Sequence, residues 1–353
     1  MTQQDWPLGI EPGQEVEVDL FKPQDAAGVV ALFAAVYGQD YPVKVYYDPE
    51  LLARENAAGR IISSVVRTPR GEVVGHNALF NSAPNPKLFE SGAGVVLSSY
   101  RNTAKLFTRM VDHGPRVTAQ QFGLEAVFAD PLCTHVYSQK LCHGLGWVTH
   151  ALELDMMPAR LYDQKAQADD RVSAIMDFVT LVPKPHQVFL PAVYEQPLRF
   201  LYQGLDDARH LEISRQAMPP DAATRIESTV YEFAQLARLA VWEAGADLEE
   251  VLAREEQAVA QRGALVRQLW LRLSCPWVGQ VVEMLRGRGY FLGGILPRWF
   301  GEDGLLMLGM AHAPHWDSIK LEFERARRLV ELVREDWHKV GAGQQTAGEG
   351  CRE

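Results

Sequence analysis

The sequence predicts a mixed α/β fold in which helices flank a central sheet, and two observations lead to this prediction. Segments whose apolar residues alternate at period two take turns along the chain with segments whose apolar residues recur at helical spacing. The order strand, helix, strand also occurs twice, at 124–156 and at 266–296, and both helices end in Gly-x-Gly followed by an aromatic residue. A chain of 353 residues is long enough for two packed units.

The first half is expected to begin with a strand at 15–21, where apolar and polar residues alternate. Asp25 is a suitable N-cap for a helix at 26–37, and Asp48-Pro49-Glu50 is typical of a second helix start. The sequence Thr-Pro-Arg-Gly at 68–71 predicts a hairpin turn. The remaining predicted elements are the hairpin strands 61–67 and 72–80, strand 90–99, helix 103–121, strand 124–129, helix 132–145, and strands 147–156 and 171–182.

A domain boundary is expected at Pro183-Lys184-Pro185, where the pattern of elements starts again. We therefore predict a first domain at 1–183, a second at 184–340, and a disordered, Gly-rich tail at 341–353. The second domain is expected to contain strands 187–190, 236–242, 266–273, 290–296 and 304–310, and helices 192–204, 247–262, 276–289 and 315–339.

The composition argues against several classes of partner. The chain carries 45 acidic and 35 basic residues, a formal net charge of −10, so bulk charge does not attract it to nucleic acid or to an anionic membrane surface. Its four cysteines form no Cys-x-x-Cys pair, which is typical of reduced thiols. No basic and apolar leader is visible, and no apolar run approaches ~20 residues. These features favour a cytoplasmic protein without nucleic-acid or membrane partners.

One face of the predicted strand 90–99 is expected to be hollow. Counting by twos, that face carries Glu90, Gly92, Gly94, Val96 and Ser98. The two glycines leave room for a ligand beside the backbone. The chain then enters a helix, and a helix N-terminus offers unpaired backbone N–H groups to an anion such as pyrophosphate. The alternative is a packed strand of small residues followed by an ordinary helix start.

The run Val-Val-Leu-Ser-Ser-Tyr-Arg-Asn-Thr-Ala at 95–104, with the elements that follow it to Leu145-Gly146-Trp147, resembles the GCN5-related N-acetyltransferase (GNAT) superfamily. The order of predicted elements across 15–182 is also that of the family. The family signature is Gln/Arg-x-x-Gly-x-Gly/Ala. Arg101 and Ala104 fit it, whereas Leu106 replaces the final small residue. The resemblance implies that strand 90–99 splays from its neighbour and that the following turn holds the pyrophosphate of acetyl-CoA.

The resemblance also implies which residues contact acetyl-CoA, which would be a co-substrate. In the strand and the turn they are Val96, Leu97, Ser98, Arg101, Asn102, Thr103 and Ala104. At the start of the next helix, Thr134, His135 and Ser138 would contact the CoA arm. For Thr134, capping of that helix is the alternative.

Two catalytic residues are implied by the same resemblance. Family members that use a strand carboxylate as general base place a Glu eleven residues before the Gln/Arg of the signature, and Glu90 holds that position relative to Arg101. A base is needed because an ammonium must lose a proton before its nitrogen can attack a thioester. Many family members have a tyrosine that acts as general acid and protonates the leaving thiolate. Cys142 stands at that position here, which leaves Tyr137 or a water as the proton donor. The alternatives are a solvent-exposed Glu90 and a buried, hydrogen-bonded Tyr137.

The acceptor is expected to bind between the first two helices, the region that GNAT enzymes vary. Four tyrosines lie there with Asp40 and Lys44, namely Tyr37, Tyr41, Tyr46 and Tyr47, and an aromatic, acidic loop can receive a cationic amine by cation–π contact. Tyr41 and Tyr46 are selected as the acceptor-binding residues. The alternative is that these rings only cover the core.

Together these features predict an acyl-CoA-dependent N-acyltransferase that acts on a small-molecule or protein amine by direct attack, without an acyl-enzyme. A non-catalytic, acyl-CoA-sensing regulator or scaffold is the alternative. The second half is expected to be a GNAT-like repeat without cofactor binding, because Asp247, Glu249 and Glu250 would repel a pyrophosphate. No metal is expected, since His312 and His315 alone supply no tetrahedral set. A homodimer is left open.

Overall fold

The computed structural model describes residues 7–39, 41–101, 105–161, 166–167, 170–205 and 207–349, and gives only the backbone of 118–120 and 343–349. The chain forms two compact units. The first comprises Met1–Ala129 with Val179–Val182, and the second comprises Asp130–Phe178 with Pro183–Glu353. Each unit is a mixed α/β structure, as the sequence predicts.

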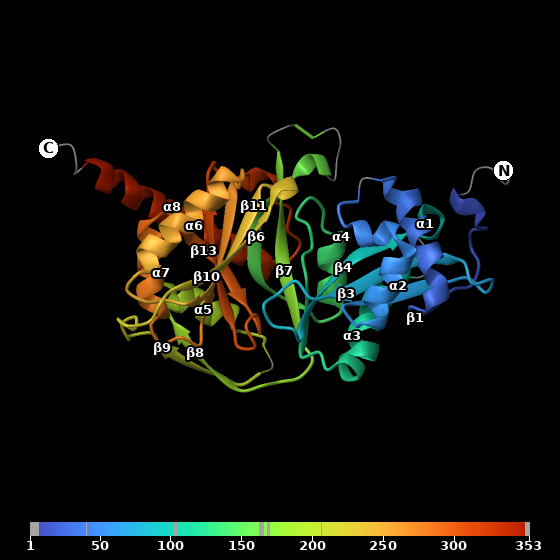
Figure 1. Ribbon diagram of the computed structural model, residues 1–353, viewed down its shortest axis with the longest axis horizontal. Helices are drawn as coiled ribbons and strands as arrows, with labels where there is room; N and C mark the ends of the chain where they lie inside the picture. The colour runs from blue at the N-terminus through green and yellow to red at the C-terminus, as the bar shows by residue number, and fades with distance from the viewer. Residues whose placement is uncertain are drawn as a thin grey trace. The chain divides into compact units, whose positions relative to one another are not determined.

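In the first unit, strands follow the order β1-β2-β3-β4-β5 across the sheet (Figure 1). Strands β1 to β4 pair antiparallel, whereas β4 and β5 pair parallel. Helices α1 and α2 pack on β2, β3 and β4, and α3 packs on β1 to β4. The bounds are β1 (Glu17–Leu20), α1 (Ala26–Tyr37), α2 (Pro49–Ala57), β2 (Ile61–Arg67), β3 (Val73–Phe80), β4 (Leu88–Val96), α3 (Leu106–Phe122) and β5 (Ala126–Ala129).

Local sequence signals explain the start of α2 and the β2–β3 turn, whereas the residue predicted to cap α1 has another role. Asp48 caps α2 by accepting a hydrogen bond from the backbone N–H of Leu51 at 2.9 Å. Gly71 adopts a φ of 82° in the β2–β3 turn. Asp25 precedes α1 but does not cap it. Its carboxylate instead accepts a hydrogen bond from Nε of Arg67 at 2.7 Å.

In the second unit, the main sheet has the strand order β7-β6-β13-β14-β12-β11-β10, and β8 and β9 form a separate parallel pair. Strands β11 and β12 are parallel, and the other pairs of the main sheet are antiparallel. The bounds are α4 (Tyr137–Gly144), β6 (Val148–Pro158), β7 (Arg171–Thr180), β8 (His186–Leu190), α5 (Glu195–Leu201), β9 (Arg209–Ile213), β10 (Arg225–Tyr231), β11 (Leu236–Glu243), α6 (Leu248–Gln261), β12 (Val266–Arg272), α7 (Val278–Gly287), β13 (Phe291–Leu296), β14 (Gly304–Met310) and α8 (Glu324–Glu349).

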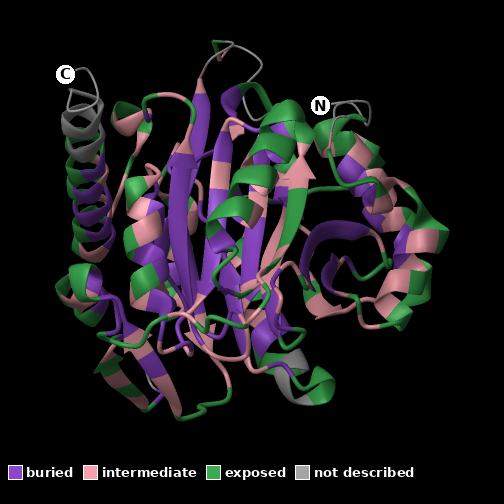
Figure 2. Cartoon of the chain, turned by 60° about the vertical axis from the view of Figure 1, so that its left-hand side comes forward, coloured by how far each residue is buried: buried purple, intermediate pink, exposed green. Residues whose placement is uncertain are grey.

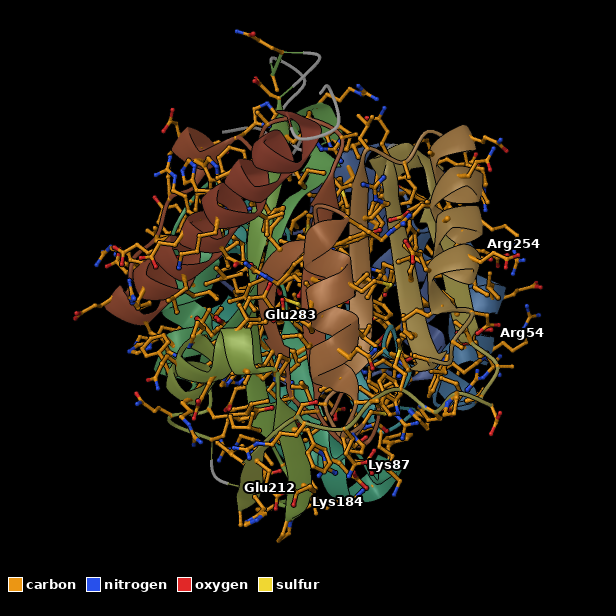
Figure 3. All side chains as sticks on the ribbon, turned by 90° about the vertical axis from the view of Figure 1, so that its left-hand side faces the viewer. Arg54, Lys87, Lys184, Glu212, Arg254 and Glu283 are labelled. Atoms are coloured by element: carbon orange, nitrogen blue, oxygen red, sulfur yellow. The ribbon has the colours of Figure 1, made fainter. Side chains whose placement is uncertain are left out.

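The main sheet of the second unit is the buried layer. Figure 2 shows its central strands buried along most of their length. Helix α8 packs on β13 and β6, and α7 packs on α8. Charged side chains such as Arg254 of α6 and Glu283 of α7 are exposed on the outer surface (Figure 3). This division of apolar and charged residues explains why the helices lie where they do.

The predicted repeat of strand, helix and strand is confirmed, and both helices end in the same way. Gly146 after α4 and Gly289 after α7 have φ values of 80° and 93°. The next residue closes each turn, since the N–H of Trp147 donates to the carbonyl oxygen of Cys142 and that of Tyr290 to Leu285, both at 3.0 Å. A glycine is required at both positions because other residues rarely adopt this conformation.

The compact units do not coincide with the predicted boundary at 183–185. Strand β6 pairs with β13 through Ala151 and Gly294, and α8 packs on both strands, so the segment from Asp130 to Phe178 belongs with the C-terminal half. The predicted tail also differs, since α8 continues to Glu349, while 350–353 lie outside the described residues.

Two strands of the second unit, β9 and β10, were not predicted, and α8 begins at Glu324 rather than at 315. Both strands are largely exposed and carry charged residues, which weakens the apolar alternation on which a strand prediction depends. None of the helices in the described part of the chain has both the length and the apolar character needed to cross a bilayer.

Candidate functional site

The candidate site lies in the first unit, where β4 parts from β5. The two strands pair in parallel at Leu88, Phe89 and Glu90, opposite Ala126, Val127 and Phe128. Strand β4 then continues to Val96 alongside β3, whereas β5 ends at Ala129. The edge of β4 beyond Glu90 is therefore released from β5, as the predicted splay requires.

A bulge at Ala93 shapes this edge. Ala93 has a φ of 51°, and the register between β3 and β4 shifts at this point. The bulge is held by His76 of β3, whose Nδ1 lies 3.0 Å from the carbonyl oxygen of Ala93 and whose Nε2 lies 3.0 Å from Oγ of Ser63. His76 is fully buried, and this burial lowers its pKa from 6.5 to about 4. The imidazole is thus neutral at pH 7.

A cavity of about 270 Å³ opens along the released part of β4. Gly94 allows the ring of Phe107 to pack closely against the strand, because a Cβ atom at this position would lie 2.7 Å from that ring. The side chain of Arg101 reaches back to β4, and its Nε donates a hydrogen bond to the carbonyl oxygen of Val96 at 3.2 Å. The cavity is lined by Val36, Tyr37, Gly94, Val95, Val96, Arg101 and Phe107.

Of the predicted cofactor contacts in this unit, Val96 and Arg101 line the cavity. Ser98 is exposed and lies two residues beyond the end of β4. Leu97 is poorly available to a ligand because its side chain is buried and both of its backbone polar groups are hydrogen-bonded. Its N–H donates to the carbonyl oxygen of Val74, and its carbonyl oxygen accepts from the N–H of Tyr100. Asn102, Thr103 and Ala104 lie outside the described residues.

Leu106, the departure from the family signature, is buried in the core of the first unit as the first residue of α3. The residue before it, Lys105, has a φ of 54°. The backbone therefore changes direction at Lys105, directly before the helix, and the side chain of Leu106 is directed into the core.

The predicted base, Glu90, is half-buried at the point where the strands part. Its Oε2 accepts a hydrogen bond from Oγ of Ser82 at 2.7 Å. A Cβ atom added at Gly92 would lie 3.1 Å from the ring of Phe80 and 3.4 Å from Oε1 of Glu90, so both side chains lie close to this glycine. Glu90 is also close enough to Tyr46 to contribute, after burial and Tyr41, to raising the pKa of that tyrosine.

The predicted acceptor residues Tyr41 and Tyr46 belong to an aromatic cluster formed by Phe33, Tyr37, Tyr41, Tyr46 and His76. Tyr46 is 2% exposed and stacks on Phe33 with ring centroids 4.4 Å apart, so it forms the base of the cluster. Tyr41 is half-buried, and Tyr37 is 39% exposed and lines the cavity. The cluster thus extends from the core to the cavity.

The remaining predicted residues belong to the second unit. Tyr137 is 79% exposed at the start of α4, and its ring lies 5.6 Å from that of His135. Thr134 does not cap α4, whose N-cap is Val136. Oγ of Ser138 is buried and makes no hydrogen bond with the described residues. Cys142 is buried, which raises the pKa of its thiol and makes it a poor proton donor.

Two residues of the site were not selected as functional from the sequence: His76 and Phe107. A polar pair, His76-Asn77, inside an otherwise apolar strand was the signal available for His76, since a buried imidazole needs hydrogen-bond partners. Phe107 carries no such signal, because one apolar residue in the first turn of a helix is ordinary.

No protein-family model matches the chain, and no curated protein matches it. Solved structures of acetyltransferases do overlap with about half of it. A ribosomal-protein-S5-alanine acetyltransferase from Vibrio fischeri is 14% identical over 48% of this chain and 94% of its own, with a TM-score of 0.38. An N-acetyltransferase from Staphylococcus aureus Mu50 is 15% identical over 48% and 99%, with a TM-score of 0.37.

A spermidine N-acetyltransferase from Vibrio cholerae, with a dodecameric structure, is 9% identical over 47% of this chain and 93% of its own, with a TM-score of 0.36. At these values the likeness carries no conclusion about what this chain binds or does. Its own geometry has to supply that.

Proposed function

We propose that this protein is an acyl-CoA-dependent N-acyltransferase that uses acetyl-CoA, with its reaction centre in the first unit. One observation carries the proposal: β4 leaves β5 after Glu90, and a cavity opens along Gly94–Val96 beside the released edge. The order of elements expected from the GNAT resemblance, from β1 to β7, is also the order that the chain has.

The residues present fit the arm of a CoA thioester. A cavity of about 270 Å³ is near the lower end of the roughly 300–1,000 Å³ typical of ligand sites, so it suits the slender pantetheine arm and leaves the nucleotide outside. Gly94 adds no side chain to the cavity that it lines, and Arg101 supplies a positive charge for a phosphate. Arg101 would have to release the carbonyl oxygen of Val96 to do so.

Glu90 and the aromatic cluster would serve the acceptor. A cationic amine would be attracted by the faces of Tyr37 and Tyr41, and the Glu90 carboxylate would take its proton, directly or through a water. Acetyl-CoA supplies an activated acyl carbon. The free amine would attack that carbon, and the C–S bond would break as the C–N bond forms.

The thiolate that leaves needs a proton. A water molecule is proposed as its donor. Asn102, Thr103 and Ala104 are proposed to hold the pyrophosphate with their backbone N–H groups.

The test is calorimetric titration of the full chain with acetyl-CoA and CoA, followed by a thiol-release assay on a panel of amines. We expect saturable binding, release of free CoA with at least one cationic amine, and weaker binding for Arg101→Ala. Arg109→Ala, which removes an exposed arginine of α3, is the matched control and should bind normally. No binding at millimolar acetyl-CoA would contradict the proposal.

A second candidate is a non-catalytic sensor of acyl-CoA. Cys142 stands where the family has the tyrosine that acts as general acid. Its thiol is buried and is a poor proton donor, which favours a sensor over an enzyme. Binding of acetyl-CoA without turnover on any amine would support the sensor over the enzyme.

A further inference from the structure

The second unit brings together three groups that are far apart in the sequence. Asp155 of β6 lies beside His312 and His315 of the loop after β14, and one ligand atom from each residue lies within 4.8 Å of the other two. His315 Nδ1 is 2.8 Å and His312 Nε2 is 3.5 Å from Oδ2 of Asp155. We propose that Asp155, His312 and His315 form a binding site for a divalent transition-metal ion of the Zn²⁺ type.

The separations fit the coordination of such an ion. Metal–ligand bonds of about 2.0–2.1 Å in a tetrahedral site place ligand atoms about 3.3 Å apart. The 3.5 Å separation matches this value, and the 2.8 Å separation requires an opening of about half an ångström. Two imidazoles and one carboxylate are a ligand set that Zn²⁺ and its neighbours accept, with a fourth position left for water.

Asp155 is held in place for this role. It sits in a bulge of β6 opposite Ser173 of β7, and its φ is 49°, an uncommon conformation for a residue other than glycine. Its backbone N–H donates to Oγ of Ser173 at 2.9 Å, and the same hydroxyl is 3.5 Å from Oδ1. The Oδ2 atom is thereby left facing the two histidines. The bulge aims a fully buried carboxylate at them.

His312 provides an independent indication. Both of its ring nitrogens are buried, and neither makes a hydrogen bond with the described part of the chain. Buried polar atoms normally have a partner, and a metal ion would supply one for the nitrogen that faces Asp155. The side chains of His312 and His315 remain 25% and 32% exposed, so the cluster lies close to the surface.

A nearby positive charge, Arg171, donates its hydrogen bonds to other groups. Its guanidinium donates to the backbone oxygens of Asp155 and Ala234, both at 2.7 Å, and to Oε1 of Gln235 at 3.1 Å. The carboxylate oxygens of Asp155 are therefore left to Ser173 and the histidines. The charge of Arg171 reduces the affinity for a cation but leaves the ligands accessible.

The competing explanation is that a proton alone links Asp155 to His315. To separate the two, the full chain is stripped with a chelator and titrated with Co²⁺, whose visible absorption reports tetrahedral or five-coordinate geometry. Zn²⁺ is then added as a competitor. We expect one Co²⁺ ion per chain with visible bands that Zn²⁺ abolishes, and a higher melting temperature with Zn²⁺ by mass action.

Three variants assign the ion to these residues. His312→Gln and His315→Gln should each weaken metal binding at least tenfold, and His312→Gln should fold normally because its ring makes no hydrogen bond. His210→Gln, which replaces a 74% exposed histidine of the same unit, is the control and should bind as the wild type does. Absence of the Co²⁺ bands in the wild type, or equal binding by all three variants, would overturn the proposal.

Discussion

The Nδ1 atom of His76 lies 3.0 Å from the carbonyl oxygen of Ala93, and this contact ties a fully buried side chain of β3 to the bulge of β4. The same ring meets Oγ of Ser63 on its other side. One neutral imidazole therefore fixes the conformation of the strand edge along which the cavity opens.

The free energy of unfolding should depend on pH through His76. Its pKa is about 4 in the folded chain against an ordinary 6.5, so the unfolded chain binds the proton more readily. The contribution is complete above pH 6.5 and is lost as the pH falls towards 4, by up to about 3 kcal/mol. Denaturant unfolding of the wild type and of His76→Gln at several pH values measures it.

The stability difference between wild type and His76→Gln should shrink over that window. His210→Gln, which replaces a histidine whose side chain is 74% exposed, is the matched control. A difference that stays constant from pH 7 to pH 4 would show that the protonation of His76 is not linked to folding.

Replacement of Glu90 by Gln should lower kcat for acyl transfer by about 10²–10⁴-fold, since the amide cannot accept the proton of the ammonium. Binding of acetyl-CoA should be nearly unchanged, because the carboxylate is assigned to the acceptor. Steady-state kinetics and calorimetry on the same preparation separate the two effects. Glu17→Gln, an exposed carboxylate of β1, is the control. Full activity of Glu90→Gln would remove Glu90 from the mechanism without removing the enzyme.

Replacement of Gly94 by Ala should weaken acetyl-CoA binding at least tenfold at little cost to folding. The new methyl group would lie 2.7 Å from the ring of Phe107, which is 37% exposed and can swing into the cavity. Calorimetric titration measures the affinity, and thermal unfolding measures the stability. Gly144→Ala, at a position with open space around it, should affect neither binding nor fold. Unaltered affinity in Gly94→Ala would place the CoA arm elsewhere.

Replacement of Gly294 by Ala should destabilise the second unit by about 3 kcal/mol or more. Gly294 has a φ of 133°, and its added Cβ would lie within 2.5 Å of the backbone of His150 and Ala151, so β13 and β6 would have to separate. Gly301→Ala tests conformation alone, because its φ is 92° but nothing lies within 4 Å, and it should cost only about 1–2 kcal/mol. Equal melting temperatures for the two variants would contradict this account.

Much of the fold could be predicted because its signals are local. Alternation and caps located α2, α6 and the β2–β3 hairpin, and β14 falls on its predicted range. The grouping of 130–178 with the C-terminal half could not be predicted, because it depends on the pairing of Ala151 with Gly294, and no local pattern encodes a partner that distant.

The candidate site was predictable to a similar degree. The two glycines of β4 and the position of Glu90 indicated where a ligand could approach. The bulge at Ala93 was not visible, since Ala has no preference for a positive φ and only the surrounding contacts impose it. The triad of Asp155, His312 and His315 was missed because the carboxylate precedes the histidines by more than 150 residues, so no spacing motif could connect them.

The pairing of β6 with β13 also sets the order in which the second unit can assemble during synthesis. Strand β6 ends at Pro158 and β13 begins at Phe291. At about 5–20 residues per second, a ribosome needs roughly 7–27 s to cover that interval. During this time β7 can pair with one edge of β6, whereas the edge that pairs with β13 stays open and α8 does not yet cover the strand. Strand β6 can therefore be paired on both edges and covered only after the C-terminal half has been made.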